Sequence, residues 1–137
     1  MGRTVVFLVL VAFLAPLNAA EVNLKNIMRE LETNLLIIIE SLLVDDREQL
    51  VLAAKEIAQH PPIPVSQRML IAEELGDEMA QFAQFDQVVH SLSLELEERG
   101  LLNSEPELIR RVQEILSACV SCHSVYKSRI ASVLAGH

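Results

Sequence analysis

The stretch Cys119-Val120-Ser121-Cys122-His123 constrains this chain more than any other part of its sequence. Two cysteines three positions apart, followed directly by histidine, form the attachment pattern of a c-type haem. In that pattern each thiol forms a thioether with one haem vinyl group, and the histidine offers an imidazole nitrogen to the iron. The chain has no other cysteine. We therefore expect Cys119 and Cys122 to hold one haem c covalently, with His123 as its proximal iron ligand.

Two other kinds of site also use closely spaced cysteines. A thioredoxin-like redox pair belongs to a βαβ setting in a cytosolic protein, and a structural zinc site needs about four ligands. The sequence around Cys119 and Cys122 provides neither setting. The chain also has no Ser/His/Asp set, no His-Glu-x-x-His helix and no Gly-rich phosphate loop. We therefore expect a haem protein that is not an enzyme.

The start of the chain has the pattern of a secretory signal peptide. Arg3 makes it positive, residues 4–15 form an almost unbroken apolar run, and residues 16–20 end in small side chains. The run is shorter than the ~20 residues that span a bilayer, so we expect cleavage after one of the last two alanines and no membrane anchor. Export agrees with covalent haem attachment, because attachment of this kind resembles what is done outside the bacterial cytoplasm. The signal peptide therefore indicates a periplasmic protein. The expected division is a cleaved leader, residues 1–20, and one domain, residues 21–137.

Composition favours packed helices and argues against two classes of partner. Aromatic residues make up only 4% of the chain, and the apolar residues are mainly Leu, Ala, Ile and Val. The net charge is −8, whereas nucleic acids and anionic membranes attract basic surfaces. We therefore expect neither as a partner. The acidity favours a solvated surface, or docking on a basic protein.

Apolar residues recur at three- and four-residue steps in four segments, which predicts an all-α protein. The first segment is apolar on more than one side, which indicates burial on two faces or a subunit contact. The last segment carries the cysteine motif, so the haem would be attached to the C-terminal helix. Cys119, Cys122, His123 and Tyr126 recur in it at three- and four-residue steps, so we expect these four side chains to share one inward face. A short extra helix before a bend at Gly76 is expected between the second and third segments, although one long helix is the alternative. The expected helices are 23–43, 46–59, 66–75, 77–100 and 104–134.

Several helix ends are predicted from local signals. Asp45 with Glu48, and Ser104 with Glu107, have the spacing of capping boxes, and Gly100 has the position of a C′ glycine. The run His60-Pro61-Pro62-Ile63-Pro64 ends the second helix and forms a rigid linker. We expect its histidine to interact with the C-terminal end of that helix; His90 has no role that the sequence indicates.

An all-helical chain with this motif in its last helix resembles the class II cytochromes c, which include cytochrome c prime and its low-spin, methionine-ligated relatives. Class I cytochromes carry the motif near the start of the mature chain. The resemblance covers the whole mature chain and extends to three further stretches. It implies an antiparallel four-helix bundle that holds the haem, and a periplasmic redox or gas-binding role. The three stretches are Ile27-Met28-Arg29-Glu30-Leu31, Ile57-Ala58-Gln59-His60-Pro61-Pro62 and Phe82 through Asp86 to His90.

The resemblance also bears on residues near the haem. Family members usually carry Arg four residues after the proximal His, and Lys127 at this position keeps a cation near the haem but loses the planar guanidinium. Many relatives have Gly where this chain has Glu32. The axial Met of methionine-ligated relatives matches Met28, which implies Met28 as the distal iron ligand; the alternative is a flexible core residue. Met69 and Met79 are weaker candidates.

These observations leave three functions open. We expect an electron carrier that exchanges electrons with a redox partner protein. The first alternative is a five-coordinate haem protein like cytochrome c prime, which binds nitric oxide or carbon monoxide. The second is a haem-free helical interaction module. An apolar gas pocket would be walled by Leu24, Leu31 and Leu35. Family members often pair through their first two helices, and the apolar residues compatible with such a homodimer are Leu36, Ile37 and Ile39.

Overall fold

The computed structural model describes residues 22–136, and all regular structure in this range is helical. The expected leader lies outside the described residues. The all-α prediction and the separate short helix before Gly76 are confirmed, and a 3₁₀ turn links that helix to the next. The elements are α1 (Leu24–Val44), α2 (Arg47–Ala58), α3 (Val65–Leu75), η1 (Gly76–Glu78), α4 (Met79–Arg99) and α5 (Glu105–Ala135).

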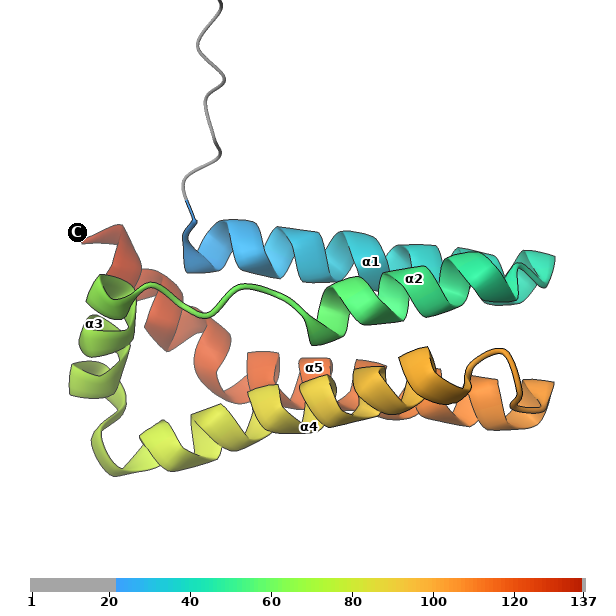
Figure 1. Cartoon of the computed structure of the whole chain (residues 1–137). Helices are drawn as coiled ribbons and strands as arrows, with labels where there is room; N and C mark the ends of the chain where they lie inside the picture. Colours follow the sequence, from blue (N-terminus) through green and yellow to red (C-terminus); the bar gives the residue numbers. More distant parts are fainter. Residues whose placement is uncertain (1–21, 137) are drawn as a thin grey trace, which may run out of the picture.

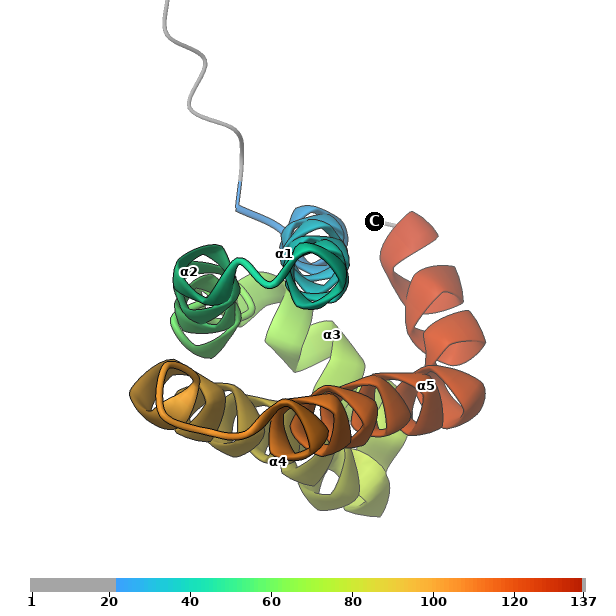
Figure 2. The same cartoon turned by 90° about the vertical axis from the view of Figure 1, so that its right-hand side faces the viewer.

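Helices α1, α2, α4 and α5 lie alongside one another in a bundle, and α3 crosses one end of it (Figure 1). Extensive contacts join α1 to α2, α2 to α4, and α4 to α5, whereas α1 and α5 contact each other much less. Helix α5 changes direction in its second half, toward α3 (Figure 2). In that half the Ser124 hydroxyl donates to the Ser121 carbonyl oxygen at 2.8 Å, a type of bond that is common in bent helices.

The boundary between α1 and α2 differs from the predicted capping box. Asp45 has a φ of 55° and ends α1 in the left-handed conformation, so it cannot adopt the extended conformation of an N-cap. Asp46 is the N-cap instead, and its carboxylate accepts from the Gln49 backbone N–H at 3.0 Å. At α5 the N-cap Ser104 is confirmed, but its side chain makes no capping bond. The Glu107 carboxylate there is bound to arginines and does not complete a capping box.

Gly100 is required for close packing and not for a left-handed turn. Its φ is −58°, which any residue can adopt, so the predicted C′ geometry is wrong. The residue is buried where α4 ends against α2. A Cβ at this position would lie 2.7 Å from Val51 Cγ2 and 2.5 Å from the Leu96 carbonyl oxygen. The glycine therefore allows the two helices to approach.

Gly100→Ala is expected to lower the free energy of unfolding by about 1–3 kcal/mol, because the added methyl overpacks the α2–α4 contact. Gly136→Ala is the matched control, since the nearest atom to its new Cβ is 3.8 Å away. That control should change stability by no more than about 0.5 kcal/mol. Urea denaturation of both variants measures the difference, and equal effects would show that Gly100 has no special packing role.

Two hydrophobic clusters stabilise the bundle. The central cluster joins α1, α2, α4 and α5 in the middle of the molecule, and burial of each large side chain there contributes roughly 1.5–3 kcal/mol. The α3-end cluster lies where α3 crosses the bundle. Its buried members are Leu24, Ile71, Leu75, Phe82, Tyr126 and Ile130, and those of the central cluster are Ile38, Leu50, Ala53, Ala54, Ile57, Leu96, Leu108, Val112 and Ile115.

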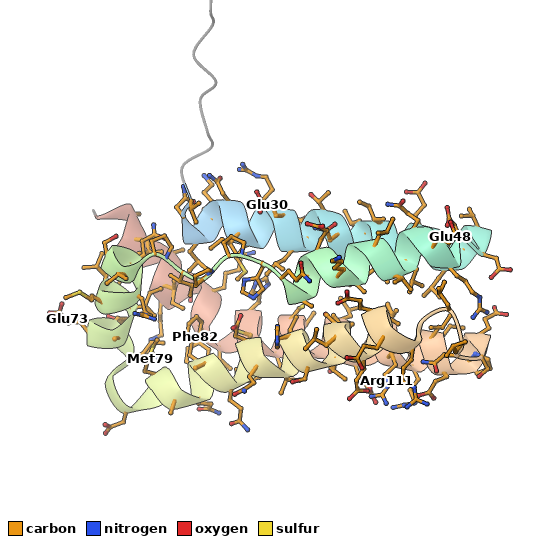
Figure 3. The ribbon with its side chains drawn as sticks, viewed as in Figure 1. Glu30, Glu48, Glu73, Met79, Phe82 and Arg111 are labelled. Carbon is orange, nitrogen blue, oxygen red and sulfur yellow. The ribbon has the colours of Figure 1, made fainter. Side chains whose placement is uncertain are left out.

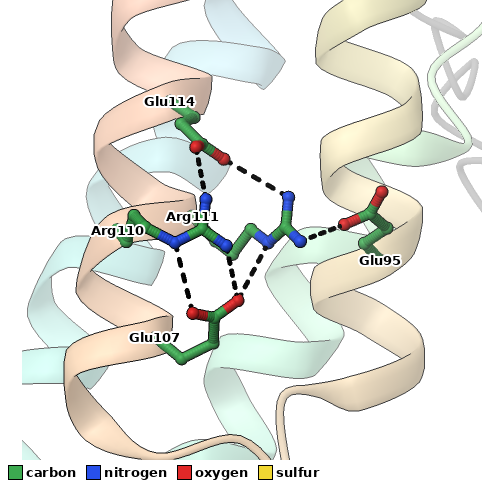
Figure 4. A network of polar contacts seen from close by, with 5 residues as sticks. All are labelled: Glu95, Glu107, Arg110, Arg111 and Glu114. Atoms are coloured by element: carbon green, nitrogen blue, oxygen red, sulfur yellow. Dashed lines mark hydrogen bonds and ion pairs between the residues drawn. The ribbon is translucent and has the colours of Figure 1, made fainter.

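Charged residues join α4 to α5 at the end of the bundle away from α3 (Figure 4). Arg111 donates across to Glu95 of α4 at 2.8 Å and also contacts Glu107 and Glu114 of its own helix. Arg110 contacts the same two glutamates. Because these groups are largely exposed, each pair contributes little stability alone, but the shared network fixes which side of α5 faces α4.

Candidate functional site

The two motif cysteines lie one turn apart on α5, at the junction of the two hydrophobic clusters. Both are free thiols and both are half-buried. Cys119 packs against the central cluster, and Cys122 packs against the α3-end cluster. The three-residue spacing on a helix places both thiols on the same side of α5. This confirms the predicted shared face for the cysteines.

Burial disfavours the thiolate form of both cysteines. It raises the pKa of Cys119, and it raises the pKa of Cys122 to about 11, with smaller contributions from Cys119 and Asp86. A thiol with such a pKa is a poor nucleophile and a poor partner for disulfide exchange. A thioether has no proton to lose, so the same burial does not oppose a covalent bond to carbon.

Met28 and Cys122 both pack against the α3-end cluster, although the two residues lie far apart in the sequence. The Met28 side chain is half-buried on α1 and packs against this cluster, which contains residues of α1, α3, α4 and α5 but none of α2. Met28 therefore lies on the side of α1 away from α2. Met79 packs against the same cluster from α4, and its side chain lies beside Phe82 in Figure 3.

Tyr126 organises the interior next to the motif. It is 1% exposed, and its hydroxyl donates to Gln81 Oε1 of α4 at 3.1 Å. The rings of Phe82 and Phe85 meet it edge-on, with centroid distances of 5.6 and 6.2 Å. Such edge-to-face pairs fix ring orientation as well as burying area. These contacts of Tyr126 thus fix the position of the part of α5 that carries Cys122.

His123 is exposed, so the prediction that it shares the inward face with the cysteines and Tyr126 is wrong. The arginines that bind α4 and η1, Arg111 and Arg129, lie on one flank of α5. On helical spacing, His123 lies on the other flank, in line with Leu116 and Val120. This flank is not covered because α1 and α5 make little contact.

An apolar strip, which we name the α1–α5 seam, lies between these two helices. It consists of three exposed residues of α5 and three half-buried residues of α1. Leu116 and Val120 are 41% and 58% exposed there, an unfavourable arrangement for adjacent apolar side chains in water. On α1, Leu35 and Ile39 lie two and three turns from Met28 and share its face, and the exposed Glu32 borders this face one turn from Met28. The seam residues are Met28, Leu35 and Ile39 of α1, and Leu116, Val120 and His123 of α5.

Other predicted site residues are placed differently. Lys127 is exposed one turn after His123, and no ion pair is recorded for it within residues 22–136. Leu24 is buried in the α3-end cluster, whereas Leu31 and Leu35 pack against the central cluster. The three leucines expected to wall a gas pocket are therefore divided between two clusters.

The contact with the C-terminal end of α2 that was predicted for His60 is made by His90. His60 was expected to interact with the C-terminal end of α2, but its Nε2 lies 3.3 Å from Asp86 Oδ1 of α4. His90 contacts the α2 end instead, with Nδ1 2.8 Å from the Ala58 carbonyl oxygen. The Asp86 bond raises the pKa of His60 against the opposing effect of burial. The sequence places all three residues in family-like stretches but gives no sign that they meet.

The raised pKa of His60 predicts a pH-dependent contribution to stability. A histidine whose pKa is raised by folding stabilises the protein below its unfolded value of ~6.5, and this contribution is lost as pH rises through the folded value. Asp86→Asn should therefore lower the free energy of unfolding more at about pH 5.5 than at about pH 8.5, by less than about 1 kcal/mol. Urea denaturation with Asp77→Asn as the control measures this, and an equal effect at both pH values would refute the coupling.

The sequence matches no known protein family, and no characterised protein or solved structure matches it either. Within residues 22–136, no helix is long and apolar enough to cross a membrane. The same part of the chain contains no group of three or more His, Cys, Asp and Glu side chains placed to hold a metal ion. The candidate site therefore depends on the motif, the seam and the residues packed behind them.

Proposed function

We propose that this chain is a periplasmic c-type haem protein that carries electrons, with one haem bound through Cys119 and Cys122. The observation that supports it best is the α1–α5 seam. The seam is a partly exposed apolar strip on the flank of α5 next to the face that carries the motif thiols, and it has a histidine on one helix and a methionine on the other. A flat apolar group attached to the cysteines would cover these side chains. We further propose that the four long helices form the antiparallel bundle of class II cytochromes c.

The residues present fit a haem group. Both thiols are unpaired and lie one helical turn apart on α5, so each could form a thioether with one vinyl group of the same haem. His123 is already accessible, and its ring needs no buried partner to be displaced before it binds iron. A bound haem would supply an iron that cycles between the ferrous and ferric states.

The side chains around the seam determine which kind of haem protein this is. Met28 provides a thioether that stays neutral at every pH, so its partial burial does not oppose binding to iron. The α3-end cluster behind it limits its movement, and Tyr126 keeps the α5 side rigid. Of the three leucines expected to wall a gas pocket, only Leu35 belongs to the seam, whereas Leu24 is buried in the α3-end cluster and Leu31 packs against the central cluster. We therefore favour electron transfer over the binding of nitric oxide or carbon monoxide.

The absorption spectrum of protein expressed with haem-attachment machinery tests the proposal. An electron carrier with histidine and methionine ligands should be low-spin in both oxidation states, and the reduced form should not bind carbon monoxide. A high-spin ferric protein that binds carbon monoxide when reduced would support the gas-binding alternative. Protein without a haem spectrum would contradict both functions and leave a helical interaction module.

A further inference from the structure

The outer face of α3 carries apolar side chains where a peripheral helix is expected to be polar. Val65 and Met69 are 62% and 67% exposed, whereas Ile71 and Leu75 on the opposite side are buried in the α3-end cluster. A shallow open hollow lies over this face and is lined by Ser66, Met69, Leu70, Ala72 and Glu73. The helix is therefore apolar on both sides, but only its inner side has a partner within residues 22–136.

Charged groups of both signs border this face. Arg68 is exposed one turn after Val65, whereas Glu73 points outward from α3 (Figure 3) and Asp77 is exposed in η1, just beyond the end of α3. Neither carboxylate has an ion pair in the described part of the chain, in contrast to Glu74 and Glu78, which are bound by Arg129 at 3.2 and 2.9 Å. The outer face thus presents an apolar centre with Arg68 on one flank and two carboxylates without an ion pair toward its C-terminal edge.

The face also lies close to the candidate haem site. Ile71 and Leu75 contact the cluster against which Cys122 and Met28 pack, so only the thickness of α3, about 10 Å, separates the outer face from that cluster. The whole chain is acidic, with a net charge of −8. Its field attracts a basic protein and repels a second acidic copy.

We propose that the outer face of α3, centred on Met69 with Glu73 and Asp77 at its edge, is the docking surface for a redox partner. The partner is a protein with an apolar contact patch bordered by lysine or arginine side chains. The identity of the partner as a redox protein rests on the proposed electron-carrier function. An apolar centre with a charged rim is the usual composition of a specific interface, in which the centre contributes affinity and the rim steers encounter.

The test measures electron transfer from the reduced holoprotein to a basic, lysine-rich class I cytochrome c by stopped-flow absorption. Met69→Ser should lower the second-order rate constant about fivefold to tenfold, since it removes the apolar centre. Glu73→Gln with Asp77→Asn should lower it about threefold to tenfold at low salt, and the difference should vanish near 1 M salt. The matched controls are Leu52→Ser and Glu56→Gln on α2, which have the same spacing and comparable exposure.

Two further measurements separate the possible failures. Reduction by ascorbate should be the same in all variants, because a small molecule needs no docking surface. Calorimetric titration with the same basic cytochrome measures binding to the α3 surface even if the chain lacks haem. A chain without haem that still binds through this surface would contradict the proposed function and support the docking surface. Rate constants and affinities that are equal in α3 and α2 variants would overturn the docking proposal. It would also be overturned if sedimentation showed a dimer that Met69→Ser dissociates, since a second copy would then cover this face.

Discussion

Replacing Cys119 and Cys122 together by alanine is expected to abolish covalent haem attachment completely. Under the proposed attachment each thiol would form one of the two thioether bonds, and the described part of the chain has no other cysteine to replace them. Each side chain is small and only half-buried, so each substitution should lower stability by about 1 kcal/mol or less and leave the helices intact. Haem staining of a denaturing gel measures retention, and far-ultraviolet circular dichroism checks the fold.

Single variants and a neighbouring residue provide the controls for this experiment. Cys119→Ala and Cys122→Ala should each retain some haem through the remaining bond, because one thioether is enough to survive denaturation. Ser121→Ala lies between the cysteines on an exposed position and should retain haem like the wild type. Haem that stays on the double variant under denaturing conditions would show that attachment uses another residue.

Met28→Ala is expected to convert a low-spin protein into one that binds carbon monoxide. Removal of the thioether leaves only aliphatic side chains on the α1 side of the seam, and none of them offers a lone pair to iron. The sixth position should then open, with a high-spin ferric spectrum and a lower reduction potential. Absorption spectra of both oxidation states, with and without carbon monoxide, measure the change.

Met79→Ala is the matched control for Met28→Ala. Met79 is another half-buried methionine that packs against the α3-end cluster, but it comes from α4 and not from the seam. Its truncation should lower stability to a similar extent and leave the haem spectrum unchanged. Identical spectra of wild type and Met28→Ala would exclude Met28 as a ligand, and a loss of ligation only in Met79→Ala would identify the other methionine.

The sequence predicts the helices well because their signals are local. Periodic apolar residues indicate each helix, the prolines after His60 mark the linker, and Gly76 marks the bend, where its φ of 50° favours glycine. The predicted caps fail where two signals compete for one residue. Asp45 ends α1 and so cannot also start α2, and Glu107 binds two arginines and so does not return to Ser104.

The site is only partly predictable because it depends on which helices meet. Local spacing places Cys119 and Cys122 correctly on one side of α5, but the same spacing suggests an inward His123, which is exposed because α1 and α5 diverge. The packing of Met28 and Cys122 against one cluster and the contact of His60 with Asp86 are long-range relationships. No periodic pattern encodes them, and only the family resemblance points to Met28.

Covalent haem attachment is the central claim, and denaturing mass spectrometry of the purified mature chain tests it most directly. The protein should be expressed in cells with working haem-attachment machinery and analysed after full unfolding, so that only covalently bound groups remain. We predict a mass equal to the polypeptide plus one haem, with the added mass located by proteolysis on the peptide that contains Cys119 and Cys122. A mass equal to the bare polypeptide would contradict the proposal.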